Sequence, residues 1–148
     1  MFGWKWKNFI GTLAAAAFAA AICFGIAAAN ICKLSAIDGA RTYYLDSSSS
    51  QSLQKDELIF QDLFRVRGES VRFTRPDGVS AETLARQTAE TLGGEILFTE
   101  NACGTVSYYG YAPKLGESIC LYGKQVNFHI AVGGAECAVG RPIIFGGF

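Results

Sequence analysis

Apolar positions follow two patterns in this chain: one continuous stretch, and a longer region in which they alternate with polar positions. The stretch Phe9–Ala29 (FIGTLAAAAFAAAICFGIAAA) carries no charge over 21 residues. An α-helix rises about 1.5 Å per residue, so this stretch would be roughly 30 Å long, the thickness of the hydrocarbon core of a bilayer. The pattern predicts an N-terminal signal or anchor helix within residues 1–37.

The residues before this stretch indicate its orientation. Lys5 and Lys7 precede it, and no acidic residue does. By the positive-inside rule, the N-terminus stays in the cytoplasm and the chain after the stretch lies outside. Trp4 and Trp6 suit the headgroup level of a membrane. The first predicted partner is therefore the membrane itself, through Phe9–Ala29.

Two fates of the stretch stay open. A cleaved signal peptide would use Ala27–Ala29 as its A-x-A site and leave a mature N-terminus at Asn30. A retained anchor explains the length better, because the apolar core of a signal peptide has about 7–15 residues. A buried helix of a soluble protein is the third alternative. The expected location is the cell membrane, single-pass with an extracytoplasmic C-terminal domain, or the exterior if the signal is cleaved.

Residues 38–57 contain the low-complexity run Ser47–Ser52. Such a run cannot bury apolar surface, so we expect residues 38–57 to be a flexible, Ser-rich linker. Residues 58–148 then form an extracytoplasmic domain with one core.

A single amphipathic helix is predicted after residue 80. Ser80 is a favourable N-cap, and Gly93-Gly94 ends the helical pattern. Five residues form one apolar stripe at helical spacing: Ala81, Leu84, Ala85, Thr88 and Leu92. This stripe indicates a helix that covers one face of a sheet.

Alternating patterns predict strands in the rest of the domain. They are Ser70–Thr74, Glu95–Glu100, Thr105–Tyr111, Ser118–Tyr122, Gln125–Val132, Glu136–Val139 and a terminal edge strand or tail at Pro142–Phe145. Together with the helix they predict an α+β fold with an antiparallel sheet of about five to six strands and one covering helix.

Charge and cysteine content narrow the function classes. The whole chain is neutral, with 13 basic and 13 acidic residues, and residues 38–148 hold 10 basic and 13 acidic residues, a net charge of −3. Such a surface argues against nucleic acid as a partner. Cys103, Cys120 and Cys137 could form one disulfide with one free thiol, or remain three thiols. Their spacing and the single histidine indicate no metal site, and no cofactor motif is present.

One face of the predicted sheet would remain uncovered by the single helix. Alternation places Tyr109, Tyr111, Asn127 and His129 on that face, which makes them a candidate binding face. His129 has no serine or aspartate placed beside it as a catalytic partner, so no catalytic residue is predicted and an enzyme is not favoured.

Three segments resemble the C-terminal portion of the YwmB family: SYYGYAPKL (107–115), GKQVNFHIAV (123–132) and GRPIIFGGF (140–148). That family comprises exported proteins of Firmicutes with unassigned biochemistry, and its members are longer than this chain. It carries a label of similarity to TATA-box-binding proteins, which describes a fold. The resemblance covers residues 65–148 and implies export and that fold, but no catalytic residues.

The combined expectation is a membrane-anchored or secreted protein of the cell envelope with an interaction or structural role and an envelope protein as a further partner. The alternative is a small-molecule- or glycan-binding module, or a hydrolase, that uses the uncovered sheet face.

Overall fold

A computed structural model describes residues 2–47, 49 and 51–145. The chain forms two compact units, residues 1–32 and 33–148. The first unit is the helix α1 (Phe2–Ile31). Within it, Phe9–Ala29 is long and apolar enough to cross a membrane, and none of its most apolar window is buried. The predicted apolar helix is therefore confirmed, and it suits a membrane span or a signal sequence equally.

The second unit is built on an antiparallel sheet of seven strands in the order β2-β1-β3-β9-β8-β5-β4. The strands are β1 (Ala40–Leu45), β2 (Leu53–Lys55), β3 (Val66–Thr74), β4 (Glu95–Ala102), β5 (Thr105–Tyr111), β8 (Phe128–Val132) and β9 (Glu136–Arg141). A separate hairpin pairs β6 (Ile119–Leu121) with β7 (Lys124–Val126), and short 3-10 turns lie at η1 (Phe60–Asp62) and η2 (Pro113–Leu115). The α+β class is confirmed, with more strands in the sheet than predicted.

The additional strands come from the segment predicted to be a linker. Residues 40–45 pair along β3, from Ala40 opposite Arg72 to Leu45 opposite Val66, and β2 pairs with β1. Tyr44 and Leu45 are 2% and 0% exposed, so the segment buries apolar surface and is part of the domain. The prediction of a linker over residues 38–57 is thus wrong for its strands. Ser48 and Ser50 lie outside the described residues, and the flexibility of the serine run stays a prediction.

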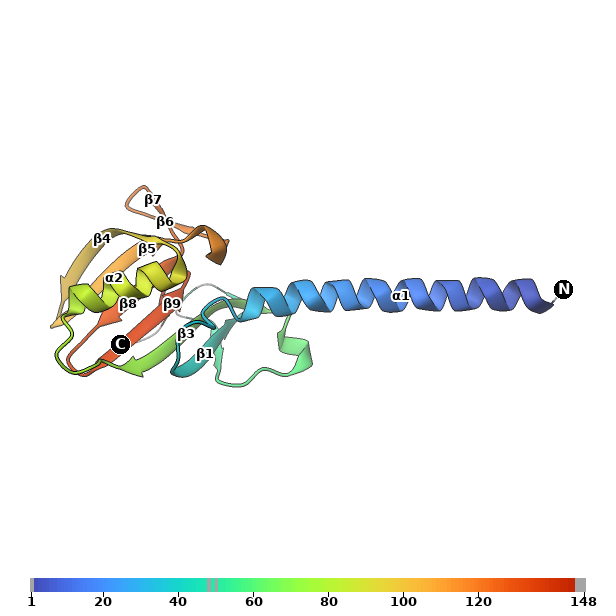
Figure 1. Ribbon diagram of the computed structural model, residues 1–148, viewed down its shortest axis with the longest axis horizontal. Helices are drawn as coiled ribbons and strands as arrows, with labels where there is room; N and C mark the ends of the chain where they lie inside the picture. The colour runs from blue at the N-terminus through green and yellow to red at the C-terminus, as the bar shows by residue number, and fades with distance from the viewer. Residues whose placement is uncertain (1, 48, 50, 146–148) are drawn as a thin grey trace. The chain divides into compact units, whose positions relative to one another are not determined.

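Helix α2 (Ala81–Leu92) covers one face of the sheet, as predicted (Figure 1). The Ser80 side chain caps it by accepting the backbone N–H of Thr83 at 3.1 Å. Gly93 ends it with φ at 68°, a left-handed conformation that glycine adopts without strain. The buried face of α2 packs on side chains of the sheet that include Val71, Phe128, Ile130, Val132 and Val139.

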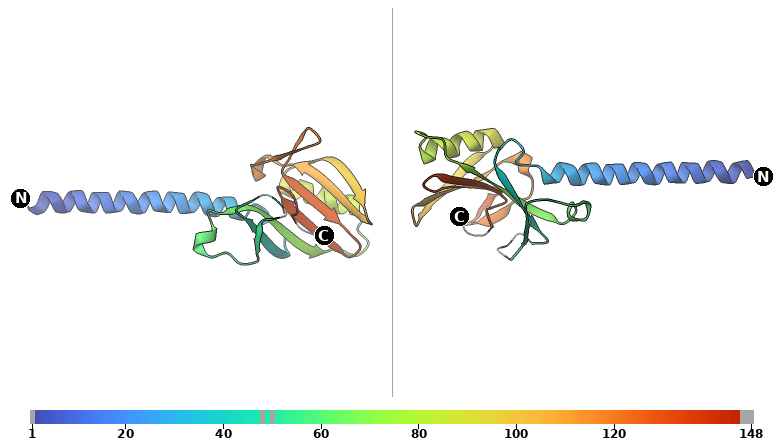
Figure 2. Two further views of the ribbon diagram at one scale, coloured as in Figure 1. Left: turned by 180° about the vertical axis from the view of Figure 1, so that it is seen from behind. Right: turned by 90° about the horizontal axis from the view of Figure 1, so that it is seen from below.

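The opposite face is partly covered by the segment that follows β9. Seen from behind, this face is turned toward the viewer, and α2 lies beyond the sheet (Figure 2). Ile144 is buried there with Ala131 and Ala138. A Cβ at Gly140 would lie 2.6 Å from the backbone nitrogen of Ile144, so only glycine permits this close approach. Pro142–Phe145 is therefore a tail that covers the sheet, and of the two predicted alternatives, edge strand or tail, the edge strand is wrong.

The beginning of the second unit is attached to the sheet by buried polar groups. The backbone N–H of Leu34 donates to the carboxylate of Glu69 at 3.0 Å. Arg41 lies 3.5 Å from the same carboxylate and also donates to the carbonyl of Leu34 at 3.2 Å. Because Glu69 is fully buried, these contacts connect the residues after α1 to the interior of the domain.

Candidate functional site

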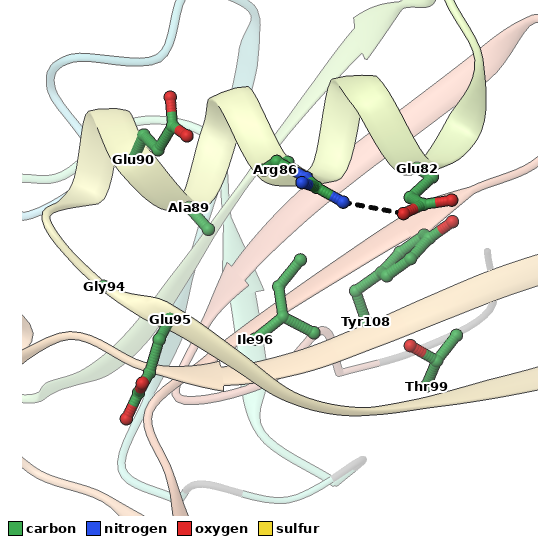
Figure 3. Close-up of a pocket in the computed structure, with 9 residues that line it drawn as sticks. All are labelled: Glu82, Arg86, Ala89, Glu90, Gly94, Glu95, Ile96, Thr99 and Tyr108. Carbon is green, nitrogen blue, oxygen red and sulfur yellow. Dashed lines mark hydrogen bonds and ion pairs between the residues drawn. The ribbon is translucent and has the colours of Figure 1, made fainter.

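A groove with a volume of about 560 Å³ lies between α2 and β4 (Figure 3). The helix forms one wall and the start of β4 the other. The lining residues are Glu82, Arg86, Ala89, Glu90, Gly94, Glu95, Ile96, Thr99 and Tyr108. Ala89 and Ile96 give the groove apolar side chains, and the other side chains of its lining are polar or charged.

Acidic side chains dominate the rim of the groove. Glu82, Glu90 and Glu95 bring three carboxylates and Arg86 one guanidinium, so the lining has a net charge of −2. Arg86 donates to Glu82 at 2.8 Å, which leaves the carboxylates at the other end of the groove outside this ion pair. The groove therefore favours a cationic ligand over an anionic one.

Tyr108 adds a hydrogen-bonding group to the groove. Its ring rises from β5, and its hydroxyl end points toward Glu82 (Figure 3). Burial raises the pKa of Tyr108, and the negative charge of Glu82 raises it further. The hydroxyl therefore stays protonated at neutral pH and can donate to a ligand.

The groove runs beside the edge of the sheet, because β4 is the last strand in the sheet order. The register of β4 against β5 shifts between Ile96 and Phe98, which marks a bulge. The Lys124 ammonium donates to the carbonyl of Leu97 at 2.9 Å at the same place. A bulge and a lysine both hinder pairing with a further strand, so residues 96–98 of β4 are blocked. Residues 99–102 are the part of this edge that is open to another strand.

The four residues of the predicted binding face differ in burial. Tyr109 and Tyr111 are half-buried. Asn127 is 0% exposed, and His129 is 9% exposed, so the prediction that these two side chains face solvent is wrong. The side chain of Asn127 bonds to the backbone of Ala112 instead, and the predicted strand 125–132 breaks at this residue into β7 and β8.

A row of aromatic rings crosses the face opposite α2. Its centroid distances are 4.4 Å for His129–Tyr109, 4.7 Å for Tyr109–Phe98 and 5.6 Å for Phe98–Tyr122. Sequence reasoning missed Phe98, although the strand register places it opposite Tyr109, which lies opposite His129. Tyr122, at the outer end of the row, is 81% exposed. Hydrogen bonding to Glu100 raises the pKa of Tyr122.

His129, at the inner end of this row, is held as a neutral imidazole. Its Nδ1 accepts the backbone N–H of Ile144 at 3.4 Å. Its Nε2 is buried and has no hydrogen-bond partner in the part of the chain that the structure describes. Burial lowers its pKa from 6.5 to about 4. At neutral pH the side chain is therefore a packing element without charge.

The pKa of His129 predicts a loss of stability in acid. Between pH 6.5 and pH 4 the unfolded chain takes up the proton that the folded chain refuses, so the unfolding free energy falls as pH falls. We expect His129 to contribute about 3 kcal/mol to this fall. Denaturant unfolding of the full chain in detergent at several pH values, compared with His129→Phe, measures it. Equal pH dependence in both proteins would refute the assignment.

The five cysteines are free, and only Cys137 is buried, which raises the pKa of its thiol. Among the described residues, no group of three histidine, cysteine, aspartate or glutamate side chains is placed to hold a metal ion.

Comparison with known proteins adds no relative: no family model matches the chain, and no curated protein or solved structure matches it.

Proposed function

We propose that this protein is an interaction module of the cell envelope, with its folded domain outside the membrane. The observation that carries the proposal is an uncovered apolar helix followed by a domain with its own core. Phe9–Ala29 would deliver that domain across the membrane and, if not cleaved, hold it there. The strands of its sheet all lie between residues 40 and 141, outside the apolar stretch.

The YwmB-like assignment forms part of this proposal. The segment GRPIIFGGF includes Ile144 and Phe145, which are buried against the sheet face opposite α2. The ring of Phe145 meets that of Tyr44 edge to face at 5.1 Å. The resemblance at this segment therefore has a packing explanation, which supports a shared fold more than a shared activity. Residues 146–148 lie outside the described part.

The groove between α2 and β4 is the proposed contact surface, and an extended segment of a partner polypeptide is the proposed ligand. An extended segment can pair with a free strand edge while alternate side chains enter a neighbouring groove. The net negative charge of the lining residues favours lysine or arginine among those side chains. Residues 99–102 supply the edge.

For the alternative, a module that binds small molecules or glycans, the structure leaves fewer candidate binding residues than the sequence predicted. Asn127 and His129 are buried, which leaves Tyr109, Tyr111 and the exposed Tyr122 as candidates on that face. The observation in its favour is the aromatic row beside Glu100, because stacked rings with a nearby carboxylate suit a sugar.

Site-specific photocrosslinking tests the interaction module. A photoreactive residue at Thr99, in the groove, should capture an envelope protein in intact protoplasts. The same residue at Gln54, an exposed strand position at the opposite edge, is the matched control. Glu82→Lys should reduce capture about tenfold, since it reverses a charge that lies at the groove beside Tyr108 (Figure 3), whereas Glu136→Lys, outside the groove, should not.

Two results would contradict the proposal. Equal capture from both positions would exclude the groove as the specific contact surface. A domain that is protected from protease added to the intact protoplasts would place it on the cytoplasmic side and exclude export.

A further inference from the structure

The loop between β2 and β3, residues 56–65, presents large apolar side chains to solvent; we call it the apolar loop. Ile59 is 59% exposed, Phe60 67% and Phe64 55%. The rings of Phe60 and Phe64 meet edge to face with centroids 6.4 Å apart, so they form one surface. Single exposed apolar residues are common, but such a cluster marks a contact surface.

Polar contacts of one buried and one exposed carboxylate hold the apolar loop in this shape. The carboxylate of Asp62, which is 1% exposed, accepts the Lys55 ammonium at 2.8 Å and the backbone N–H of Ile59 at 3.2 Å. The hydrogen bond with Lys55 lowers the pKa of Asp62, so the carboxylate stays ionised. Arg65 donates to Asp46 at 2.8 Å at the other end of the loop. The Asp62 carboxylate thus points inward, whereas Ile59, Phe60 and Phe64 point outward.

The apolar loop lies beside the point where the chain enters the second unit. Arg41 donates to the carbonyls of Leu34 and Ile37, and the next residue, Thr42, donates to Asp56 at 2.8 Å. The entering segment and the start of the loop are therefore attached to adjacent residues of β1. Figure 1 shows the loop, in green, beside β1.

The length of the connection keeps this end of the domain near the bilayer. The backbone N–H of Leu34 donates to Glu69, and Leu34 follows Ala29 by five residues. Five extended residues reach at most about 17 Å. A retained anchor would therefore hold the attachment point of the domain within that distance of the apolar core of the membrane.

We infer that Ile59, Phe60 and Phe64 insert into the headgroup region of the bilayer that holds Phe9–Ala29. This inference rests on the anchored form of the proposed function. Aromatic and aliphatic side chains favour the membrane interface, where they leave water without entering the apolar centre. The basic groups at the two ends of the loop, Lys55 and Arg65, are paired with Asp62 and Asp46, so we expect insertion to depend on apolar contact more than on lipid charge.

Fluorescence quenching by brominated lipid tests the inference in the full chain. The protein, with Trp4 and Trp6 replaced by phenylalanine, carries Phe60→Trp and is reconstituted as one copy per phosphatidylcholine nanodisc. The matched control is Tyr122→Trp, an exposed ring in the β6–β7 turn. Brominated phosphatidylcholine should quench Phe60→Trp at least about twofold more than the control, with or without phosphatidylglycerol. Phe64→Trp should respond in the same way as Phe60→Trp, and it replaces that variant if folding fails.

Each other outcome has a distinct meaning. Equal quenching of Phe60→Trp and Tyr122→Trp in nanodiscs that retain the protein would overturn the insertion and leave the anchor intact. If the tryptophan of Phe60→Trp is shielded from quenching only when several copies share a detergent micelle, the loop takes part in self-association instead. A mature N-terminus at Asn30 in cells would exclude the anchor, and the insertion with it.

Discussion

The Asn127→Ala variant is expected to lose about 4 kcal/mol of unfolding free energy, because it leaves buried backbone groups without hydrogen bonds. The Oδ1 of Asn127 accepts the N–H of Ala112 at 2.7 Å, and its Nδ2 donates to the carbonyls of Ala112 and Gly116 at 2.8 and 3.2 Å. The side chain is 0% exposed, so water cannot replace it without opening the domain.

Denaturant unfolding of the full chain in detergent measures this loss. Gln125→Ala is the control. Gln125 lies two residues before Asn127 and is exposed, and in the described structure its side chain bonds only to the exposed Ser118. We expect that control to change the unfolding free energy by less than about 0.5 kcal/mol. Asn127→Asp keeps an acceptor for Ala112 but places a buried carboxylate against two carbonyl oxygens, so at neutral pH it should lose at least as much as Asn127→Ala. An Asn127→Ala protein as stable as the control would disprove the role of the amide.

The Glu69→Ala variant is expected to lose about 3–5 kcal/mol, the cost of removing one partner from a buried ion pair. The carboxylate of Glu69 lies 3.5 Å from Arg41 and 3.9 Å from Arg141, and Arg141 is itself buried. Burial raises the pKa of Glu69, whereas the N–H of Leu34 and the two guanidinium groups oppose that rise. Without the carboxylate, Arg141 keeps its charge in a buried site that has lost its counter-ion.

Two comparisons separate this network from an ordinary surface pair. Glu82→Ala removes an exposed pair with Arg86 on α2 and should cost no more than about 0.5 kcal/mol. Glu69→Gln keeps an acceptor for the N–H of Leu34 and should lose less than Glu69→Ala. Because Leu34 depends on Glu69, limited proteolysis should also cut residues 33–37 faster in Glu69→Ala. Unchanged proteolysis and stability would show that Glu69 does not attach this segment.

The pattern of consecutive residues was sufficient to predict the helices and several of the strands. The apolar helix follows from the absence of charge in Phe9–Ala29, and α2 follows from Ser80, its apolar stripe and Gly93. The alternating runs that became β4, β5 and β9 were also identified. The groove was not, because it forms only where α2 lies beside the edge strand β4, and no local pattern states which strand is at the edge.

Long-range contacts decided the positions that the sequence assigned wrongly. Residues 40–45 look like part of a linker beside a serine run, but pairing with β3 makes them a strand. Alternation placed Asn127 and His129 in solvent, yet the backbone of Ala112 takes up one side chain, and Tyr109 and Ile144 cover the other. Burial of a polar side chain depends on partners far away in the chain, which periodicity does not contain.

By itself, the sequence determined an apolar N-terminal helix, an α+β class and the covering helix α2, because each depends on the character of consecutive residues. Only the tertiary structure decided that the domain begins close behind that helix, that Glu69 and Asn127 are buried in polar networks, and that Phe60 and Phe64 form one exposed surface. These features depend on which distant segments pair, and pairing is set by the packing of the whole domain.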